Sequence, residues 1–262
     1  MTKALPQFVV RLARSEGDLR AAQRLRYAVF VEELGGGGAM VDHASRLEQD
    51  RFDPFFDHLL LLDEARAPDD RVVGVYRLLR EDQADRAGQF YSEDEYDLSV
   101  LKASGRPLLE LGRSCLHPDY RGGMGMYHLW HALAAYVEAH GIEILFGVAS
   151  FHGTDPAALA EPLSLLHHRH LAPDDLRVIA RPEGFAAMDR IAAAHLDRKA
   201  AMLAVPALIK AYLRLGGFVG QGAFVDRAFN TTDVCLILDV ARMNASQRAI
   251  YTRPVHPGSA RA

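Results

Sequence analysis

The sequence predicts an α+β fold, in which one sheet is covered by amphipathic helices. Three observations carry this prediction. A strand, a glycine-rich loop, a helix and a second strand follow one another between Leu108 and Phe151. Two strand-like runs, His58 to Leu62 and Arg71 to Leu79, flank a turn. A capped helix pattern follows Ser15. We expect a single domain over 1–247, with a helical insertion at about 152–216 and a loose tail over 248–262.

Composition excludes several classes of protein. The chain has 262 residues, of which 49% are hydrophobic and 24% charged, enough for a sizeable core. A formal net charge of -4 disfavours general nucleic-acid binding. Cys115 and Cys235 lie in apolar runs and are expected to be reduced core residues, which argues against a disulfide or a metal site. We find no secretory signal and no apolar run approaching the ~18 residues of a spanning helix. The prediction is a cytoplasmic protein that at most lies against a membrane.

The N-terminal part predicts a strand and a helix. Phe8 to Ala13 is apolar and partly β-branched, as in a strand. Ser15 to Asp18 resembles a capping box, and apolar residues then recur at helical spacing up to Val29. Arg26 and Phe30 lie four residues apart beside this apolar stripe. A basic residue in that position usually lies at the solvated edge of a helix, and this is expected for Arg26.

A long acidic loop follows Gly35 to Gly38 and runs to about Asp57. It contains Asp42, Asp50 and Asp53 among three phenylalanines, which argues against simple disorder. A functional loop and an acidic surface loop both fit this pattern. In the strand that follows, Arg77 is surrounded by apolar residues and must reach solvent, a partner or a ligand. Residues 81–106 are polar and acidic and are expected to form a surface excursion, with Tyr91, Tyr96 and Leu98 as possible anchors.

The stretch LLELGRSCLHPDYRGGMGMYH, residues 108–128, carries the strongest functional signal. An apolar strand with Glu110 and Arg113 leads into the loop Arg121-Gly122-Gly123-Met124-Gly125, and a helix pattern ending near Gly141 follows. This order points backbone N–H groups at an anion, usually a phosphate. Ile142 to Phe151 is expected to be the next strand, parallel to the first.

The sequence of the glycine-rich loop narrows the choice of ligand for this phosphate-binding segment. It could hold a nucleotide, coenzyme A or a phosphopantetheine arm. No Gly-Lys-Ser/Thr ending and no G-x-G-x-x-G spacing is present, which disfavours P-loop and Rossmann sites and leaves acyl transfer from a pantetheine-type donor. An amine acceptor must lose a proton, and Glu110 is the candidate base. The alternative is a structural ion pair of Glu110 with Arg113 or Arg77. On a regular strand Glu110 and Arg113 face opposite sides, so a shared pocket requires a bulge near Gly112.

The C-terminal part is basic in places. Three histidines at 167, 168 and 170 favour a surface or partner-contact cluster over zinc. A weak helix is expected at about 185–196, and a further helix runs from Pro206 to Gly216. The latter favours core packing, although a basic amphipathic helix also suits an anionic membrane or carrier surface. Residues 165–216 hold eight basic against five acidic side chains. The last strands are predicted at 223–225 and 233–238, joined by an Asn-Thr-Thr turn.

The chain resembles the ornithine N-acyltransferases of ornithine-lipid synthesis, a hemolysin-like GNAT family related to the acyl-homoserine-lactone synthases. The resemblance runs from about Leu25 to Val234. It rests on the motifs LRYAVFVEE, D-x-x-D, VVGVYRLL, FYSEDEYDL, LELGRSCLHPDYR and FNTTDV. It implies a three-layer α/β/α architecture with a central mixed, twisted sheet. The glycine loop departs from the GNAT pattern, because Met124 and Met126 stand at its two small-residue positions.

The resemblance also implies roles for residues. Glu110 would be the base, and the acceptor pocket would be shaped by Arg26, Phe30, Asp50, Asp53, Arg77 and Arg113. The donor would be a 3-hydroxyacyl group on the phosphopantetheine of acyl carrier protein, with no other cofactor and no metal. The acceptor would be the α-amine of ornithine, and another acyltransferase would complete the resulting lyso-lipid. This agrees with the residue types, since arginines suit a carboxylate and aspartates an ammonium.

We expect direct acyl transfer without a covalent enzyme intermediate. Backbone N–H groups near Ser114, Cys115 and Leu116 would stabilise the oxyanion, and Arg121, Gly122, Gly123 and Gly125 would hold the donor. Cys115 as nucleophile is disfavoured because no histidine is placed as its base. The alternatives are acylation of another amino acid such as glutamine, lactone synthesis, and a non-catalytic acyl-carrier or membrane-binding protein. The expected location is the cytoplasm, with possible peripheral contact with the inner membrane.

Overall fold

A mixed sheet forms the centre of the molecule in the computed structural model, which describes residues 5–247. Its nine strands are antiparallel to their neighbours except for β5 and β6, which are parallel. Their spatial order is β1 (Phe8–Leu12), β2 (Asp57–Asp63), β3 (Val72–Arg80), β5 (Leu108–Leu116), β6 (Ile144–His152), β11 (Thr231–Asp239), β10 (Ala223–Asp226) and β8 (Phe185–Ala186), with β9 (Phe218–Val219) beside β11. The predicted strands, including the parallel pair joined by a helix, are confirmed.

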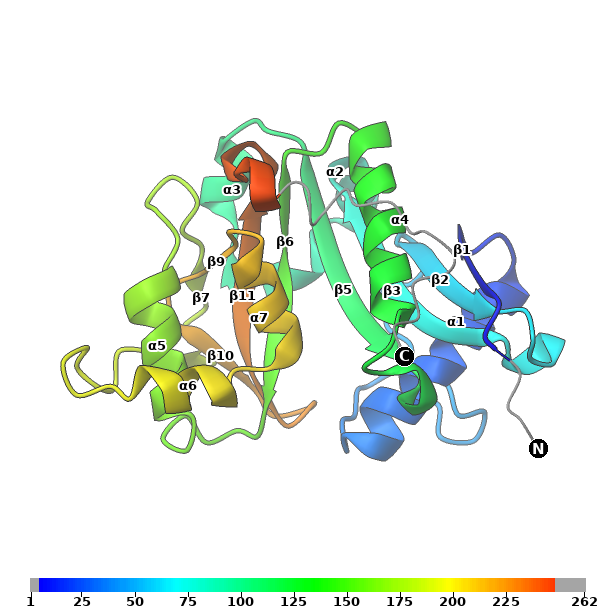
Figure 1. The fold of residues 1–262 in the computed structure, drawn as a ribbon, viewed down its shortest axis with the longest axis horizontal. Coiled ribbons are helices and arrows are strands. Elements are labelled where there is room, and N and C mark those ends of the chain that lie inside the picture. The colour runs from blue at the N-terminus through cyan, green and yellow to red at the C-terminus, as the bar shows by residue number, and fades with distance from the viewer. Residues whose placement is uncertain (1–4, 248–262) are drawn as a thin grey trace.

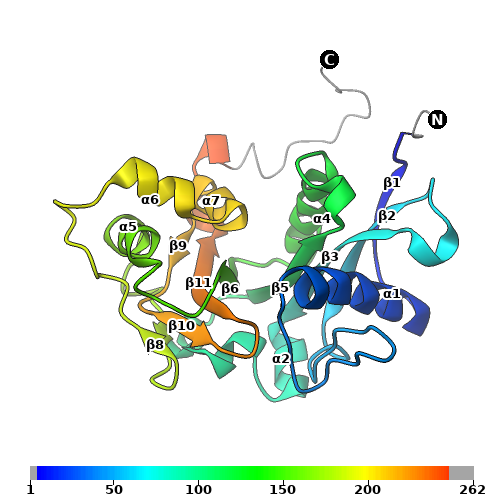
Figure 2. The ribbon, with the colours of Figure 1, turned by 90° about the horizontal axis from the view of Figure 1, so that it is seen from below.

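Helices cover both faces of this sheet, which gives the three layers that the resemblance implies (Figures 1 and 2). On one face lie α4 (Gly125–Ala139), α5 (Ala160–His170), α6 (Arg198–Ala204) and α7 (Ala207–Arg214). The other face carries α1 (Glu16–Arg26), α2 (Glu81–Ala87) and α3 (Ser99–Ala103). Each face has its own apolar core: Leu129 and Ile209 belong to the first, while Leu25 and Phe90 pack on the second. The α+β prediction is therefore confirmed.

The first helix begins as its sequence predicts and continues in a different geometry. The Ser15 hydroxyl accepts the Asp18 N–H at 3.1 Å, which caps α1. From Tyr27–Glu33 the chain is a π-helix, and it ends before Gly35, whose φ is +70°. π-helical segments are rare and occur often at functional sites. Here the segment carries Phe30 toward the cleft described below.

Residues 81–106 are not a surface excursion, and that prediction is wrong. Phe90, Tyr96, Leu98 and Leu101 are buried and pack under the sheet with the phenylalanines of the acidic loop. The Tyr96 hydroxyl donates at 2.9 Å to the carbonyl oxygen of Asp233, which fixes this segment to β11. Tyr96 and Leu98 are anchors that the sequence indicates, whereas Phe90 and Leu101 are further buried residues of this irregular segment. The segment includes the 3-10 turn Tyr91–Asp94 and the short strand β4 (Tyr96–Asp97).

The region 152–216 is more varied than the predicted helical insertion. It holds α5, α6 and α7 but also β7 (Ile179–Ala180), which pairs with β4, and β8, which joins the main sheet. The weak helix expected at 185–196 is wrong, because this stretch begins as β8 and continues in turns and bends. Short 3-10 turns occur at Pro68–Asp70, Pro118–Tyr120 and Val240–Arg242. The predicted tail over 248–262 lies outside the described residues. Within 5–247, no helix combines the length and the apolar character that crossing a bilayer requires.

Candidate active site

A cleft opens where β5 and β6 part. The two strands pair only from Leu108 to Glu110, opposite Ile144 to Phe146, and then diverge toward their carboxyl ends (Figure 1). β6 continues in full register with β11 on its other side. The cleft has a volume of about 400 Å³. It is lined by Phe30, Leu34, Tyr91, Gly112, Arg113, Ser114, Val148, Ala149, Ser150, His152, Pro206, Leu208, Asp226, Phe229, Thr231 and Asp233.

A narrower apolar cavity of about 40 Å³ adjoins the cleft. It shares the wall from Gly112 to Ser114 and runs between the strands beneath Leu208 and Tyr212 of α7. The close approach at its narrow end requires glycine, because a Cβ on Gly147 would lie 2.1 Å from the Leu111 carbonyl oxygen. The gap is thus closed on one side by strand pairing and open on the other.

The predicted bulge near Gly112 is confirmed. Val75 pairs with Cys115 and Arg77 pairs with Gly112, so one residue of β3, Tyr76, lies opposite two residues of β5, Arg113 and Ser114. The residue in the left-handed region is Arg113, with φ +49°, rather than the glycine. The bulge places three consecutive residues, Gly112, Arg113 and Ser114, in the wall of the cleft.

Glu110 is buried one step behind that wall. Its carboxylate accepts the Tyr91 N–H at 2.7 Å, the Ser92 N–H at 2.6 Å and the Ser92 hydroxyl. Burial raises the pKa of Glu110 to about 7, although these hydrogen bonds and Arg77 oppose the shift. Tyr91 separates the carboxylate from the cleft, since its N–H binds Glu110 and its side chain lines the opening. Among the described residues Glu110 forms no ion pair, so the alternative of a pair with Arg113 or Arg77 is wrong.

The predicted polar residues of the acceptor pocket meet in one buried ion network. Arg26 pairs with Glu48 and, at 2.6 Å, with Asp53. Arg77 pairs at 2.7 Å with both Asp50 and Asp53. Arg113 completes the set by contacting Glu48 at 3.2 Å and Asp50 at 3.7 Å. Three guanidinium groups thus face three carboxylates.

The network shows how the acidic loop folds. Arg26 and Arg77 are 0% exposed, so the expectation of a solvated edge for Arg26 is wrong. The flanking arginines lower the pKa of Glu48 and of Asp53 to about 2, against the opposing effect of burial. The loop is therefore held down by charge rather than solvated.

Only part of the predicted substrate-binding set reaches the cleft. Arg113 and Phe30 line it, whereas Arg26, Arg77, Asp50 and Asp53 stand behind it and bind one another. Direct substrate contact by these four stays a prediction. The Arg113 guanidinium lies 5.0 Å from the Tyr91 ring centroid and 4.7 Å from that of Phe229, and it donates to the Tyr91 hydroxyl at 3.1 Å. Aromatic faces and carboxylates thus fix its position.

Glu48 was missed in the sequence. The charge balance of the predicted pocket could have indicated it, because the pocket contains three arginines and only two acids, Asp50 and Asp53. A buried cluster of that kind requires a third acid. Glu48 lies two residues before Asp50 in the same loop.

The predicted donor loop lies beside the bulge, where Ser114 Oγ approaches Met126 Sδ at 4.0 Å. Arg121 forms a two-pronged pair with Glu33 at 2.6 and 2.7 Å, and its Nε donates to the Leu116 carbonyl oxygen at 3.1 Å. Gly122 has φ +73°, and Gly123 leads through the exposed Met124 to Gly125, the first residue of α4. Backbone N–H groups in the first turn of a helix lack intrahelical partners and suit an anion. Donor binding by this loop stays a prediction.

The predicted oxyanion residues differ in their surroundings. Ser114 lines the cleft, whereas Leu116 pairs with Gly74 in the ladder. Cys115 packs on the α1 side of the sheet with Leu25 and Val75, and burial raises the pKa of its thiol to about 12. A protonated thiol away from the cleft is a poor nucleophile, which supports direct transfer.

Three carboxylates that the sequence did not single out gather on the β11 side of the cleft. Ligand oxygens of Glu95, Asp226 and Asp233 all lie within 4.8 Å of one another. Burial and the neighbouring acids raise the pKa of Asp233 to about 6 and that of Glu95 well above its usual value. The predicted histidine cluster lies elsewhere, on α5, where His168 Nε2 bonds the carbonyl oxygen of Ile191 at 2.8 Å.

Comparisons with known proteins agree with this architecture. A family model described as an acetyltransferase (GNAT) domain matches residues 25–131. An L-ornithine N(alpha)-acyltransferase of Rhodobacter capsulatus is 62% identical over 257 residues, which cover 97% of this chain and 98% of the relative. A second protein of that name, from Brucella abortus, is 45% identical over 92% of this chain and 88% of its own length.

Two solved structures are similar over nearly the whole chain. FeeM, an N-acyl amino acid synthase from uncultured soil microbes, aligns with a TM-score of 0.52 at 11% identity, over 93% of this chain and 98% of its own. LasI, an acyl-homoserine-lactone synthase, aligns with a TM-score of 0.48 at 16% identity, over 94% of this chain and 95% of its own. At this identity the likeness to FeeM establishes the fold alone.

Proposed function

Because the chain belongs to the family of L-ornithine N(alpha)-acyltransferases and is an acyltransferase, we propose that it acylates the α-amine of ornithine. The single observation that carries the acceptor is the 62% identity to a relative of that name over 97% of this chain. The geometry supports it independently, since the cleft is lined both by the guanidinium of Arg113 and by the carboxylates of Asp226 and Asp233. An α-amino acid with a cationic side chain matches that pattern of charge.

The donor in this proposal is a 3-hydroxy fatty acyl group on the phosphopantetheine of acyl carrier protein. The thioester lies between the diverging strands, with the phosphate at the N-terminus of α4 and the acyl chain toward the apolar cavity. The donor is a substrate, and no cofactor is needed. The product is a lyso-ornithine lipid, which a second acyltransferase completes.

The reaction is direct transfer. Glu110 accepts the proton of the ammonium group through a water that passes Tyr91, and the free amine then attacks the thioester carbonyl carbon. Backbone N–H groups near Ser114 stabilise the oxyanion. Collapse of the tetrahedral intermediate breaks the carbon–sulfur bond, and the departing thiolate takes up the proton that the attacking nitrogen releases as the amide forms. A pKa of Glu110 near 7 suits this role at neutral pH.

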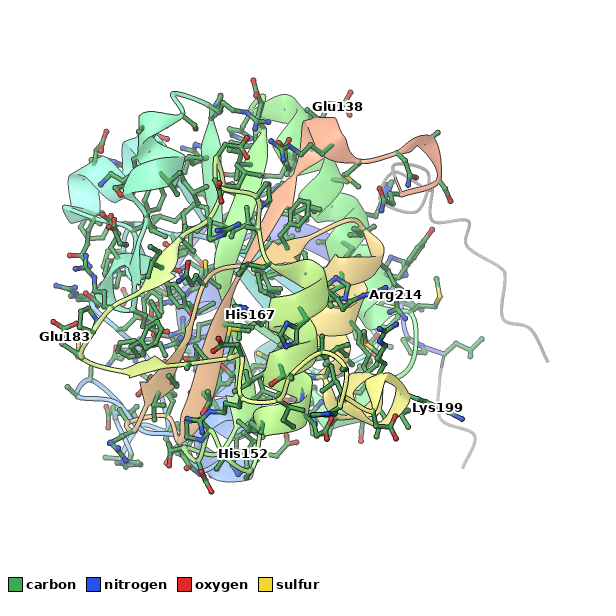
Figure 3. All side chains as sticks on the ribbon, turned by 90° about the vertical axis from the view of Figure 1, so that its left-hand side faces the viewer. Glu138, His152, His167, Glu183, Lys199 and Arg214 are labelled. Atoms are coloured by element: carbon green, nitrogen blue, oxygen red, sulfur yellow. The ribbon has the colours of Figure 1, made fainter. Side chains whose placement is uncertain are left out.

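The carrier protein is placed beside α6 and α7. Their exposed basic residues include Lys199 and Arg214, which point outward on the same side of the molecule (Figure 3). Pro206 and Leu208, at the start of α7, line the cleft. An acidic carrier docked there has its pantetheine arm close to the opening. The same basic surface suits peripheral contact of a cytoplasmic protein with an anionic inner membrane.

The test is an assay of the purified protein with 3-hydroxyacyl carrier protein and separate amine acceptors: ornithine, glutamine and S-adenosylmethionine. We expect thiol release with ornithine and a product with the mass of the N-acyl amino acid. N-acylglutamine or an acyl-homoserine lactone as main product would contradict the proposed acceptor. No thiol release with any amine favours a non-catalytic acyl-carrier or membrane-binding protein.

A further inference from the structure

The cluster of Glu95, Asp226 and Asp233 is assembled from distant parts of the chain. Glu95 follows the 3-10 turn Tyr91–Asp94, Asp226 ends β10 and Asp233 lies in β11. The Glu95 and Asp233 side chains are buried, at 5% and 4% exposure, and Asp226 and Asp233 line the cleft. Asp233 pairs with Ser150 of β6 in the ladder, and both residues line the cleft.

These carboxylates have fewer partners than the other buried acids of the protein: Asp233 interacts with the hydroxyls of Ser150 and Thr231, and Glu95 interacts with Asp233. Asp53 and Asp239 are ion-paired with arginines, and Glu110 accepts three hydrogen bonds. By contrast, over residues 5–247 neither Glu95 Oε2 nor Asp233 Oδ1 has a hydrogen-bond donor, and neither residue forms an ion pair. Asp226 uses one oxygen to accept the N–H groups of Ala228 and Phe229. Buried acceptors without donors are costly unless a ligand supplies them.

We propose that this cluster binds the side-chain ammonium of the amino-acid acceptor and selects for a diamino acid. The proposal rests on the proposed function and adds to it the group that reads the far end of the substrate. An alkylammonium has three N–H donors, which match three converging carboxylates. Arg113, which lines the same cleft and is held in place by Glu48 and Asp50, is the counterpart for the α-carboxylate. The α-amine is thereby presented between these two anchors, beside the bulge.

Selection follows from the cost of leaving the carboxylates unpaired. An acceptor with the same carbon chain but no terminal amine fills the cleft without supplying a donor to Glu95 or Asp233. Sites that hydrogen-bond a polar substrate group reject the analogue lacking it by large factors, up to about 10⁴. Three converging carboxyl groups, two of them buried, place this site in that class.

The first test uses the wild-type protein and two acceptors, ornithine and norvaline, which differ only by the terminal amine. We expect kcat/KM for ornithine to exceed that for norvaline by about 100-fold or more. Acylation of norvaline as efficiently as ornithine overturns the proposal and leaves the proposed acyltransferase activity standing. Absence of acylation with both acceptors overturns the proposed function itself, and this inference with it.

The second test uses Asp233→Asn and Glu95→Gln. We expect KM for ornithine to rise about 10- to 100-fold in each, while kcat/KM for norvaline is unchanged or higher. Asp239→Asn is the matched control: it removes a buried carboxylate from the other end of β11, outside the cleft, and should leave the ratio of the two acceptors unchanged. An equal fall for both acceptors in the cluster variants overturns the proposal.

The third test separates an ammonium site from a metal site, since three carboxylates also suit a divalent cation. Ornithine turnover should be the same after EDTA treatment and after addition of Ca²⁺ or Mg²⁺. Loss of activity with EDTA, restored by one of these ions, would assign the cluster to the metal and overturn the proposal.

Discussion

A carboxylate that is buried, hydrogen-bonded and close to neutral in pKa is suited to accept a proton, and Glu110 has all three properties. Glu110→Gln should lower kcat about 10²- to 10⁴-fold with little change in KM, because the acceptor anchors remain. In the wild type, kcat/KM should rise about tenfold per pH unit up to pH about 7, where Glu110 becomes ionised, and this limb should vanish in the variant.

The check is a pH–rate profile of both proteins, with circular dichroism to confirm folding. Glu143→Gln is the control, since Glu143 is an exposed acid paired with Arg106 outside the cleft. Wild-type rates in Glu110→Gln would remove Glu110 from the mechanism.

The buried ion network shifts the pKa of its carboxylates downward, in the opposite direction to the shift of Glu110, and so affects stability at low pH. The pKa of Glu48 and that of Asp53 are lowered to about 2 in the folded state, below the value of about 4 expected in the unfolded chain. Between pH about 2 and about 4 the unfolded state therefore binds more protons than the folded state. The stabilisation is present above pH about 4 and is lost as the pH falls toward 2.

Glu48→Gln should cost about 3–5 kcal/mol at pH 7, because it removes a counter-ion from both Arg26 and Arg113 and leaves three guanidinium groups facing two carboxylates. It should also flatten the decline in stability between pH 5 and 3. Urea unfolding across this range measures both effects. Glu32→Gln, which breaks an exposed pair with Arg46, is the control and should change stability by less than about 1 kcal/mol. Equal effects of the two substitutions would contradict a buried network.

At the residue scale, the sequence predicts which side chains need a charged partner more readily than it predicts which residue that partner is. Arg77 was recognised as a charge in an apolar strand that needs a partner, and the structure supplies Asp50 and Asp53. Whether those aspartates serve the protein or a substrate could not be decided, because both uses require the same residue types at the same spacing. In the structure Glu48 supplies the third carboxylate of the set.

Secondary structure elements position this site through two irregularities, the bulge in β5 and the glycine in β6. The bulge could be predicted, because Glu110 and Arg113 are three apart and a regular strand would turn them to opposite faces. The π-helix after Arg26 could not, since the apolar spacing that indicates an α-helix also fits a helix that widens near its end. The sequence indicates anchors in residues 81–106, but the extent of their burial could not be predicted, because the buried residues follow no helical or strand period.

Gly147 keeps the two strands close at the point where they begin to diverge. Gly147→Ala should destabilise the protein by about 1–3 kcal/mol, because the added Cβ would lie 2.1 Å from the Leu111 carbonyl oxygen and the backbones must shift. Thermal unfolding measures the effect. The control is Gly17→Ala in α1, where the nearest atom, Ser15 Oγ, would lie at 3.6 Å and a small gain in stability is expected. An unchanged melting temperature for Gly147→Ala would show that the strands are not held by this contact.

The whole molecule brings together residues that the sequence keeps far apart. Glu95 and Asp233 are separated by 138 positions, and nothing in the local sequence of either indicates the other. Their meeting depends on the order of strands in the sheet and on the segment before β4, which was itself predicted to lie on the surface. The residues of β5 and of the loop before α4 are close in the sequence, so their proximity could be predicted. The carboxylate cluster comes from distant segments, so its proximity could not.

The distribution of charge over the molecule gives the last prediction. The double variant Lys199→Glu, Arg214→Glu reverses two exposed charges beside α6 and α7 (Figure 3). With an acyl carrier protein donor, kcat/KM should fall about tenfold at low salt, because an acidic partner would no longer be attracted to this face. The loss should shrink as added salt screens the wild-type interaction. With a short acyl-pantetheine donor, which lacks the protein part, kcat/KM should stay the same. The control Arg20→Glu reverses an exposed charge on α1, across the sheet, and should leave both donors unaffected. A fall with the short donor as large as with the carrier would place the effect in the cleft rather than at a docking surface.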